Sequence, residues 1–353
     1  MSLELRKVVR RVGTETHIHE TDLALRPAGL TVLLGTTLSG KTTLMQIMAG
    51  LIRPTSGQVW FKGADVTGVA VQRRNVAMVH QQFINYGNMT VFDNIASPLR
   101  VARLARAEIT RRVEYAADLL RLTPLLGRYP SELSGGQQQR TALARALVKD
   151  ADLVLLDEPL ANLDYKLREE LRDEMPRLFS GREATVVYAT SDPLEAMLLG
   201  GFTATMHEGR VTQYGPSGDV YRAPVDLVTA RAFSDPPINV VVARKQGDRV
   251  VLVDDVGWPT PAGLRARPDG PITVAIRPHH IRPGSTGEVQ LDGRVRITEL
   301  SGSESVIHFE HGTRTWVCQA HGVHALEVGS HATFALDVAE CLYFDADGRA
   351  VAR

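Results

Sequence analysis

The stretch from Gly35 to Thr43 combines glycines, hydroxyl groups and one lysine at a spacing suited to holding a phosphate chain. It follows an apolar run typical of a buried strand, Leu30 to Leu34, and precedes residues with helical apolar spacing. Gly35 and Gly40 permit a tight turn that points backbone N–H groups at phosphate oxygens, and the helix N-terminus adds its positive dipole end. In this motif Lys41 reaches the β- and γ-phosphates and the Thr42 hydroxyl binds Mg²⁺. The remaining loop residues assigned to the site are Thr36, Thr37, Leu38, Ser39 and Thr43. A glycine-rich turn that binds nothing is the alternative for this stretch alone.

The composition excludes several classes of protein. The 353 residues are 44% hydrophobic, and 40 Lys and Arg balance 40 Asp and Glu. A net charge of zero argues against a nucleic-acid-binding protein that relies on a positive field. Cys318 and Cys341 are far apart and make no metal-ligand spacing, so we expect two buried thiols. No apolar run approaches the roughly 20 residues that span a bilayer, and Met1 to Lys7 lack the apolar core of a signal peptide. We therefore expect a cytoplasmic chain that reaches a membrane only through a partner.

Two regions with different patterns follow one another along the chain. Up to about residue 235, buried strands alternate with helices, which favours a parallel sheet with helices on both faces. Within this region the pattern is helical from Val91 to Lys149, and we expect a helical subdomain at about residues 83–150. Residues 236–353 contain short strands separated by turns, typical of a small all-β barrel. The sequence therefore predicts an α/β domain at residues 1–235 and an all-β domain at residues 236–353.

A second apolar run ends in two acidic residues. Leu153 to Leu156 is predicted as a buried strand, followed at once by Asp157 and Glu158. In phosphoryl-transfer proteins an aspartate at this place holds Mg²⁺, and a neighbouring carboxylate orients the attacking water. Both carboxylates are therefore candidates for the same site as Lys41.

The stretch Leu133 to Arg140 reads Leu-Ser-Gly-Gly-Gln-Gln-Gln-Arg, and it resembles the signature motif of ABC-type ATPases. Ser134, Gly135 and Gly136 open a helix and suit a second anion site, so the resemblance implies that they bind a γ-phosphate. Gln137 belongs to the same nucleotide-binding motif. The order of phosphate loop, signature and acidic strand end in one chain is that of the family. The resemblance implies ATP and Mg²⁺ as cofactors and an α/β P-loop fold with a mixed sheet and a helical subdomain.

Further residues match the family one by one. Gln81 stands where the family has the glutamine that senses Mg²⁺ and the membrane partner, which makes it both a catalytic and a metal-binding candidate. Asp164, within Ala161 to Asp164, resembles the residue that contacts the opposite subunit. Met206 to Pro216 resembles the strand–turn–strand that closes the ATPase domain. Ala275 to His280 resembles a motif in the β-barrel regulatory (TOBE-like, OB-like) extension of carbohydrate-importer ATPases.

The sequence departs from the family pattern at four places. Ser191 stands where a histidine is usual. A serine cannot make the charge-assisted hydrogen bond of that histidine to the γ-phosphate, and losing such a bond costs about 1.5–3 kcal/mol, or roughly tenfold to over a hundredfold in rate. Val12 stands where an aromatic residue would stack on adenine. Leu38 replaces the middle glycine of the phosphate loop. His80 and Gln82 flank Gln81 where an aromatic and a small residue are usual.

Together, the run from His80 to Tyr86 and Ala189-Thr190-Ser191 resemble the ATPase subunits of bacterial glycerol and polyol importers. The resemblance implies a pair of ATPase subunits, either two copies or this chain with a related one. It also implies two transmembrane permease subunits contacted through Gln81 to Met89, a periplasmic solute-binding protein that acts indirectly, and a place at the cytoplasmic face of the bacterial inner membrane.

Several alternatives remain open from the sequence. The chain is either a hydrolysing subunit or a weakly hydrolysing partner, and its transporter carries glycerol, a polyol, a sugar or glycerol phosphate. An ABC ATPase of DNA repair or translation would need a duplicated core or a long coiled coil, and neither is present. The all-β extension disfavours an exporter.

Overall fold

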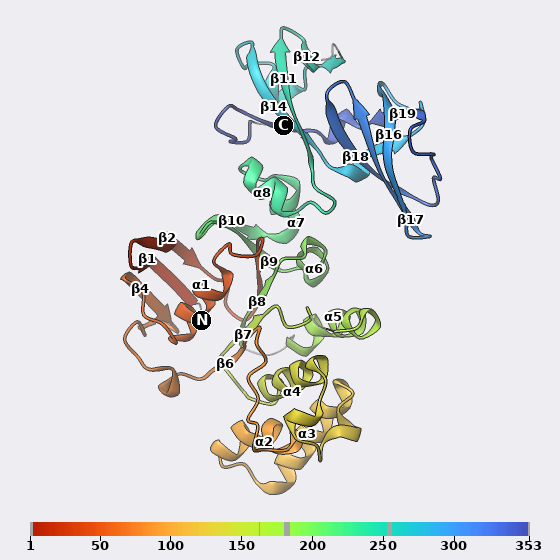
Figure 1. Ribbon diagram of the computed structural model, residues 1–353. Helices are drawn as coiled ribbons and strands as arrows, with labels where there is room; N and C mark the ends of the chain where they lie inside the picture. Colours follow the sequence, from red (N-terminus) through yellow and green to blue (C-terminus); the bar gives the residue numbers. More distant parts are fainter. Residues whose placement is uncertain (1–2, 162, 180–183, 253–255, 352–353) are drawn as a thin grey trace. The chain divides into compact units, whose positions relative to one another are not determined.

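The structure is a computed structural model that describes residues 3–161, 163–179, 184–252 and 256–351 (Figure 1). The chain divides into two compact units between Val220 and Tyr221. The sequence suggests a later boundary, near residue 235, because the segment before it is helical like the α/β region. Helix α8 (Leu227–Ala232) nevertheless belongs to the second unit, because its Ala230 packs in a small core with Ile238, Ala275 and Phe344.

The first unit contains ten strands and seven helices in the described residues, with α7 running across the division. The strands are β1 (Leu3–Val12), β2 (Glu15–Ala24), β3 (Leu30–Leu34), β4 (Ser56–Phe61), β5 (Ala64–Asp65), β6 (Val76–Val79), β7 (Leu153–Asp157), β8 (Thr185–Thr190), β9 (Phe202–His207) and β10 (Arg210–Pro216). The helices are α1 (Lys41–Ala49), α2 (Val91–Val101), α3 (Arg106–Leu119), α4 (Gly135–Leu147), α5 (Tyr165–Phe179), α6 (Pro193–Leu199) and α7 (Ser217–Arg222).

Two sheets build the first unit. The larger has the strand order β10-β9-β3-β8-β7-β6 and is parallel except for β10, while the smaller, β2-β1-β4-β5, is antiparallel. Helix α1 packs between them, since Leu44 and Met45 share one core with Leu5 of the smaller sheet and Leu33 and Val187 of the larger one. The mixed α/β fold and its sheet are as predicted.

The larger sheet positions the candidate residues. Strands β7 and β8 are buried along their whole length, as expected for central parallel strands covered on both faces. The carboxyl ends of parallel strands meet at one edge of a sheet, which is where open α/β folds bind ligands. The residues that follow these ends are Gly35 after β3, His80 after β6, Glu158 after β7 and Ser191 after β8.

The predicted helical subdomain is present as α2, α3 and α4, which Figure 1 shows grouped below the larger sheet. Thr90 caps α2 by accepting a hydrogen bond from the Asp93 N–H, and Ser134 caps α4 in the same way through Gln137. Buried apolar residues at helical spacing, such as Ile109, Val113 and Ala116 of α3, hold the three helices together.

The second unit is all-β apart from α7's last residues and α8, as predicted. Its strands are β11 (Asn239–Gln246), β12 (Arg249–Leu252), β13 (Gly257–Pro259), β14 (Gly270–Ile276), β15 (Ile281–Pro283), β16 (Val289–Leu300), β17 (Glu304–His311), β18 (Arg314–His321), β19 (His331–Leu336) and β20 (Leu342–Phe344). They form two five-stranded sheets, β13-β12-β11-β14-β20 and β15-β19-β16-β17-β18. Trp258, Trp316 and Phe334 lie in the shared core.

Both cysteines are buried and free, as expected from their spacing. Cys318 lies in the core of the second unit, where burial raises the pKa of its thiol to about 12. The thiol is therefore protonated at neutral pH and behaves as a small apolar side chain.

Candidate functional site

The phosphate-loop motif forms a tight turn between β3 and α1. The Gly35 N–H donates to the carbonyl oxygen of Thr190 at 3.3 Å, and the Ser39 N–H donates to that of Thr36 at 3.1 Å. A Cβ at Gly35 would lie 2.4 Å from the carbonyl oxygen of Met206, so a glycine is required there. Gly40, with φ of 101°, caps α1 without a side-chain hydrogen bond. The first N–H groups of α1 therefore have no side-chain cap, as a helix terminus suited to an anion requires.

Lys41 is buried, with 5% of its surface exposed, and its ammonium lies among oxygen atoms. The Nζ atom donates to the carbonyl oxygens of Gly35 at 2.7 Å and Thr36 at 3.0 Å, and it lies 3.6 Å from Oε1 of Glu158. Burial lowers the pKa of Lys41, while the charges of Glu158 and Asp157 oppose that shift. The lysine thus places a positive charge where β3 and β7 end.

Asp157 and Thr42 meet as the sequence predicts. The Thr42 hydroxyl donates to Oδ2 of Asp157 at 2.7 Å, although the two residues are far apart in the chain. Burial raises the pKa of Asp157, its hydrogen bond from Thr42 lowers it, and the neighbouring Glu158 charge raises it. A carboxylate and a hydroxyl are hard oxygen donors that suit Mg²⁺. The nearby Ser39 hydroxyl is buried and has no hydrogen-bond partner among the described residues, which fits a polar ligand in the loop.

Glu158 lies between Lys41 and Gln81. Its Oε2 atom accepts a hydrogen bond from Nε2 of Gln81 at 3.3 Å, and its own N–H donates to the carbonyl oxygen of Ala189 at 3.0 Å. The backbone of Glu158 has φ of 47°, in the left-handed region. The side chain keeps 18% of its surface exposed, so the carboxylate is held in place and still accessible to water.

Lys41, Thr42, Gln81 and Glu158 border one cavity of about 540 Å³, within the range of small-molecule sites, and Asp157 is joined to it through its hydrogen bond with Thr42. Sequence reasoning missed six of the residues that line it: Glu15, Thr16, His17, His19, Glu208 and Gly209. Strand β2 and the β9–β10 turn reach the loop through backbone hydrogen bonds, from His19 N–H to Gly209 and from Gly209 N–H to Ser39, both at 2.9 Å. From the sequence, the Glu208-Gly209 turn is predicted only as part of the strand–turn–strand that closes the ATPase domain, and not as part of the site.

Of three departures from the family pattern, Leu38 lines this cavity, whereas Ser191 and Val12 are not among its lining residues in the described chain. Leu38 is 95% exposed and has φ of 68°, a conformation that glycine adopts without strain. Ser191 is exposed and directly follows β8. Val12, at the end of β1, is 47% exposed and is not among the residues that line the cavity in the described chain.

The signature residues lie elsewhere. Ser134 accepts a hydrogen bond from the Gln137 N–H at 3.3 Å, and Gln137 Oε1 accepts one from the Ser134 N–H at 3.0 Å. Neither these residues nor Gly135, Gly136 or Asp164 belong to the described lining of the Lys41 cavity. Asp164 instead caps α5, accepting a hydrogen bond from the Leu167 N–H at 3.0 Å. The structure therefore does not bring the two predicted anion sites together within one chain.

Side chains of α2 and α4 hold the segment after Gln81 in place. Asn94 is fully buried and bonds the backbone of Tyr86 in both directions, at 2.8 and 3.0 Å. Arg145 donates to the carbonyl oxygen of Ile84, and its guanidinium lies 4.9 Å from the ring centroid of Tyr86. A groove of about 550 Å³ runs beside this segment, lined among others by Met89 and Val101.

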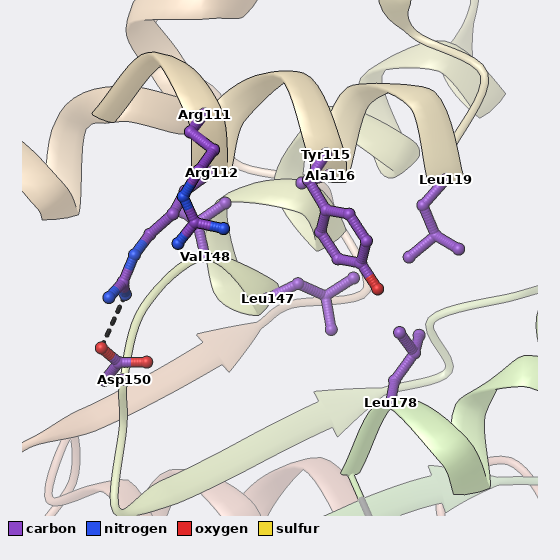
Figure 2. Close-up of a pocket in the computed structure, with 9 residues that line it drawn as sticks. All are labelled: Arg111, Arg112, Tyr115, Ala116, Leu119, Leu147, Val148, Asp150 and Leu178. Carbon is purple, nitrogen blue, oxygen red and sulfur yellow. Dashed lines mark hydrogen bonds and ion pairs between the residues drawn. The ribbon is translucent and has the colours of Figure 1, made fainter. Parts of the chain in front are cut away.

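A smaller hollow of about 210 Å³ lies between α3, the end of α4 and α5. Figure 2 shows Tyr115 beside Leu147 on one side of it, with the ion pair between Arg112 and Asp150 on the other. Arg111 and Arg112 both pair with Glu108 on α3. Among the described residues no group of three or more His, Cys, Asp or Glu side chains is placed to hold a metal ion.

Comparisons with known proteins agree with both units. A family model described as ABC transporter matches residues 18–161, and one described as TOBE domain matches residues 274–344. The sn-glycerol-3-phosphate import ATP-binding protein UgpC of Pectobacterium atrosepticum is 34% identical over 333 residues, covering 93% of each chain. The lactose transport ATP-binding protein LacK of Rhizobium radiobacter is 33% identical over 365 residues, covering 99% of each chain.

A solved structure resembles the first unit. It is the dimeric post-hydrolysis state of the ATP-binding cassette MJ0796 bound to ADP and Pi, with a TM-score of 0.57 and 26% identity over 61% of this chain and 98% of that one. That cassette holds ADP and inorganic phosphate, the two products of ATP hydrolysis.

Proposed function

Since the chain belongs to the ABC transporter family of ATP-binding proteins and is an ABC-type ATPase coupled to transport, we propose that it powers import of glycerol, a polyol or a related carbohydrate. The observation that carries the proposal is the meeting of Lys41, Gln81 and Glu158 at the ends of three parallel strands. A match to the TOBE domain, at residues 274–344, follows the ATPase unit and supports the assignment to importers.

The residues of the cavity take separate roles in this proposal. The loop N–H groups and Lys41 bind the phosphates of ATP, and Ser39 adds its buried hydroxyl. Thr42 and Asp157 would hold Mg²⁺, assisted by Gln81, and the ion would supply charge neutralisation at the phosphates. Glu158 orients and polarises the attacking water, because its carboxylate is fixed by Gln81 and remains accessible.

The separation of the two anion sites within the chain supports the proposal that two ATPase subunits pair. Ser134, Gly135, Gly136 and Gln137 start α4 away from the chain's own cavity, so they complete the nucleotide site of a second subunit, which Asp164 also contacts. The dimeric state of the related cassette supports this arrangement. The partner is a second copy of the chain or a related one.

The membrane partners follow from the anchored segment. Gln81 contacts Glu158, and the same segment continues to Met89 beside an open groove, so a permease docked there would sense the site. No helix of the described residues combines the length and apolarity needed to cross a bilayer. From the resemblance to carbohydrate-importer ATPases, we propose that the chain lies on the cytoplasmic face of the bacterial inner membrane, on two permease subunits that receive solute from a periplasmic binding protein.

A second candidate function is a nucleotide-binding subunit that hydrolyses ATP weakly and mainly completes its partner's site. The exposed serine at position 191, in place of an imidazole, and the absence of Val12 from the described cavity lining favour it. The intact Asp157 and Glu158 favour hydrolysis in this chain's own site.

The test is ATP turnover by the reconstituted transporter with wild type, Glu158→Gln or Ser191→His in this chain. The proposal expects Glu158→Gln to reduce turnover to a small residual rate, and a rise with Ser191→His would identify the missing imidazole as limiting. Turnover that persists until another subunit's matching carboxylate is removed would support the weakly hydrolysing candidate instead.

The solute is tested in the same preparation. Glycerol, a linear polyol, sn-glycerol 3-phosphate and a disaccharide are supplied with the binding protein, and the stimulation of turnover is compared. Stimulation by glycerol or the polyol is expected. Stimulation by the phosphate ester or the disaccharide alone would contradict the solute assignment and leave the ATPase assignment intact.

A further inference from the structure

Gln139, on the second turn of α4, connects the signature helix with the backbone of the catalytic segment. Its side chain is fully buried, and Nε2 donates to the carbonyl oxygens of Pro159 at 2.7 Å and Glu158 at 3.3 Å. Its Oε1 atom is also buried and has no hydrogen-bond partner in the described part of the chain. Burying a polar amide costs free energy, so the two hydrogen bonds that Gln139 donates must offset this cost.

Glu158 needs this support because of its backbone conformation. A φ of 47° lies in the left-handed region, which a side chain with a Cβ occupies only at a cost in conformational energy. Such a conformation persists when the surrounding structure holds it from several sides. Here the Glu158 N–H donates to the carbonyl oxygen of Ala189. The carbonyl oxygen of Glu158 accepts hydrogen bonds from the Ala161 N–H and from Nε2 of Gln139.

The next carbonyl groups are held in a similar way from the other side. Arg168 of α5 donates from Nε to Leu160 at 3.2 Å and from Nη2 to Ala161 at 2.8 Å. The turn from Glu158 to Ala161 is therefore clamped between one side chain of α4 and one of α5. Gln139 is the part of this clamp that contacts the carbonyl of Glu158 itself.

We propose that Gln139 is a positioning residue that holds the Glu158 carboxylate in its working orientation and ties it to the helix that begins at Ser134. The inference rests on the proposed role of Glu158 and on the proposed contact of Ser134 with the partner's nucleotide. A shift of α4 when its first turn binds that nucleotide would be passed to Glu158 through the two hydrogen bonds. Gln139 therefore links the two nucleotide sites of the ATPase pair.

The experiment replaces the amide by an apolar side chain of similar length, Gln139→Met, in the reconstituted transporter. We expect kcat for ATP hydrolysis to fall by about tenfold to a hundredfold, as small misplacements of catalytic groups do. KM for ATP should stay within about twofold, because no group that binds ATP is changed. An unchanged kcat, or a rise in KM alone, overturns the proposal.

The neighbouring residue gives a matched control. Gln138 is on the same helix turn, and its Nε2 donates to the carbonyl oxygen of Leu133 at 3.3 Å and not to the Glu158 segment. Gln138→Met should keep the wild-type kcat. A loss equal to that of Gln139→Met would show that any glutamine deletion in α4 has this effect, which contradicts a specific role.

A double variant separates positioning from a general structural role. Adding Gln139→Met to Glu158→Gln should cause no further loss of the residual turnover, since both changes act through one carboxylate. A further loss overturns the proposal. If Gln139→Met has wild-type activity while Glu158→Gln is impaired, only this inference is contradicted. If Glu158→Gln has wild-type activity, the proposed function itself is contradicted.

Folding is checked by the thermal midpoint of each variant. Where Gln139→Met does not fold, Gln139→Asn takes its place, since it keeps an amide but is one methylene too short to reach Pro159. The same fall in kcat at constant KM is expected, and a wild-type kcat for Gln139→Asn overturns the proposal.

Discussion

The first turns of α1 and α4 both follow a loop proposed to hold phosphate, yet they are built in opposite ways. Helix α1 starts at Gly40 with no side-chain cap and with the buried Lys41 as its first residue. Helix α4 starts at Ser134, whose hydroxyl and backbone are bonded reciprocally to Gln137. The N–H groups of α1 are left for a ligand of this chain, whereas α4 is already capped by its own residues.

The glycines of the two loops also differ in how closely the rest of the chain packs against them. A Cβ at Gly35 would lie 2.4 Å from the Met206 carbonyl oxygen, but a Cβ at Gly135 would meet nothing within 4 Å in the described chain. Gly35 is thus explained by this chain's own packing. Nothing in the described chain restricts the side chain at Gly135, which leaves room for the proposed nucleotide of a second subunit.

The largest expected effect is at α1. Lys41→Ala removes the cation that lies against Glu158 and the phosphate loop, and losing one preorganised charge at a reacting group costs about 10²–10³ in kcat. ATP turnover of the reconstituted transporter measures this. Lys62→Ala, which removes an exposed lysine paired with Asp152, should leave turnover unchanged. Equal losses in both variants would contradict the assignment of the cavity.

The next effect, at Gly135, separates stability from activity. Gly135→Ala fits the described chain and replaces glycine in a helical turn, so the free energy of unfolding should rise by about 0.5–1 kcal/mol. ATP turnover should nevertheless fall by about tenfold, because the added methyl group meets the partner's nucleotide. Urea denaturation and turnover assays report the two changes. A stabilised variant with wild-type turnover would mean that α4 contacts no nucleotide.

Mixing two variants tests whether α1 and α4 serve the same site. In dimers of this chain, Lys41→Ala paired with Gly135→Ala keeps one intact site, formed by one α1 and the other α4. Random pairing leaves about a quarter of the wild-type sites, so mixing the two impaired preparations should raise turnover to about that level. No restoration would mean that α1 and α4 act within one chain.

The sequence predicts the α1 site better than its surroundings. The sequence locates Lys41 and Thr42 in the loop and helix that follow β3, and Asp157 and Glu158 at the end of β7, and the ends of parallel strands converge. His17 and Glu208 were missed because β2 and the β9–β10 turn reach the loop by backbone pairing that leaves no local motif. Gln139 was read only as part of the signature, since its contact with Glu158 is made by a side chain across two elements.

A smaller effect concerns the end of β8, which supports the α1 loop. Glu195 is buried and accepts hydrogen bonds from the hydroxyls of Thr190 at 2.6 Å and Tyr188 at 3.1 Å. Burial raises the pKa of Glu195 above its ordinary value of 4.5, so the folded chain binds this proton more tightly than the unfolded chain. Its contribution to stability therefore falls as pH rises from about 4.5 through the raised pKa.

Glu195→Gln keeps an acceptor and removes the charge, so this pH-dependent loss should disappear. Above the raised pKa the variant should equal or exceed wild type in free energy of unfolding, measured by urea denaturation from pH 4 to 8. The exposed Glu327→Gln controls for the loss of one negative charge. A variant destabilised equally at all pH values would show that the hydrogen bonds, not the charge, decide the effect.

The smallest effect is expected at Leu38 in the loop before α1, because its backbone has a conformation that favours glycine. Its φ of 68° costs a side chain about 1–2 kcal/mol, and its 95% exposure means that no packing offsets this cost. Leu38→Gly removes the strain but adds freedom to the unfolded chain, so the free energy of unfolding should rise by only about 0.5–1 kcal/mol. Leu38→Ala deletes the same exposed atoms without relieving φ, so it should match wild type in urea denaturation. Equal gains for glycine and alanine would assign the effect to lost exposed apolar surface. A gain for glycine alone would show that the loop keeps its phosphate-binding turn at the cost of strain, which α4, capped by Ser134, does not need.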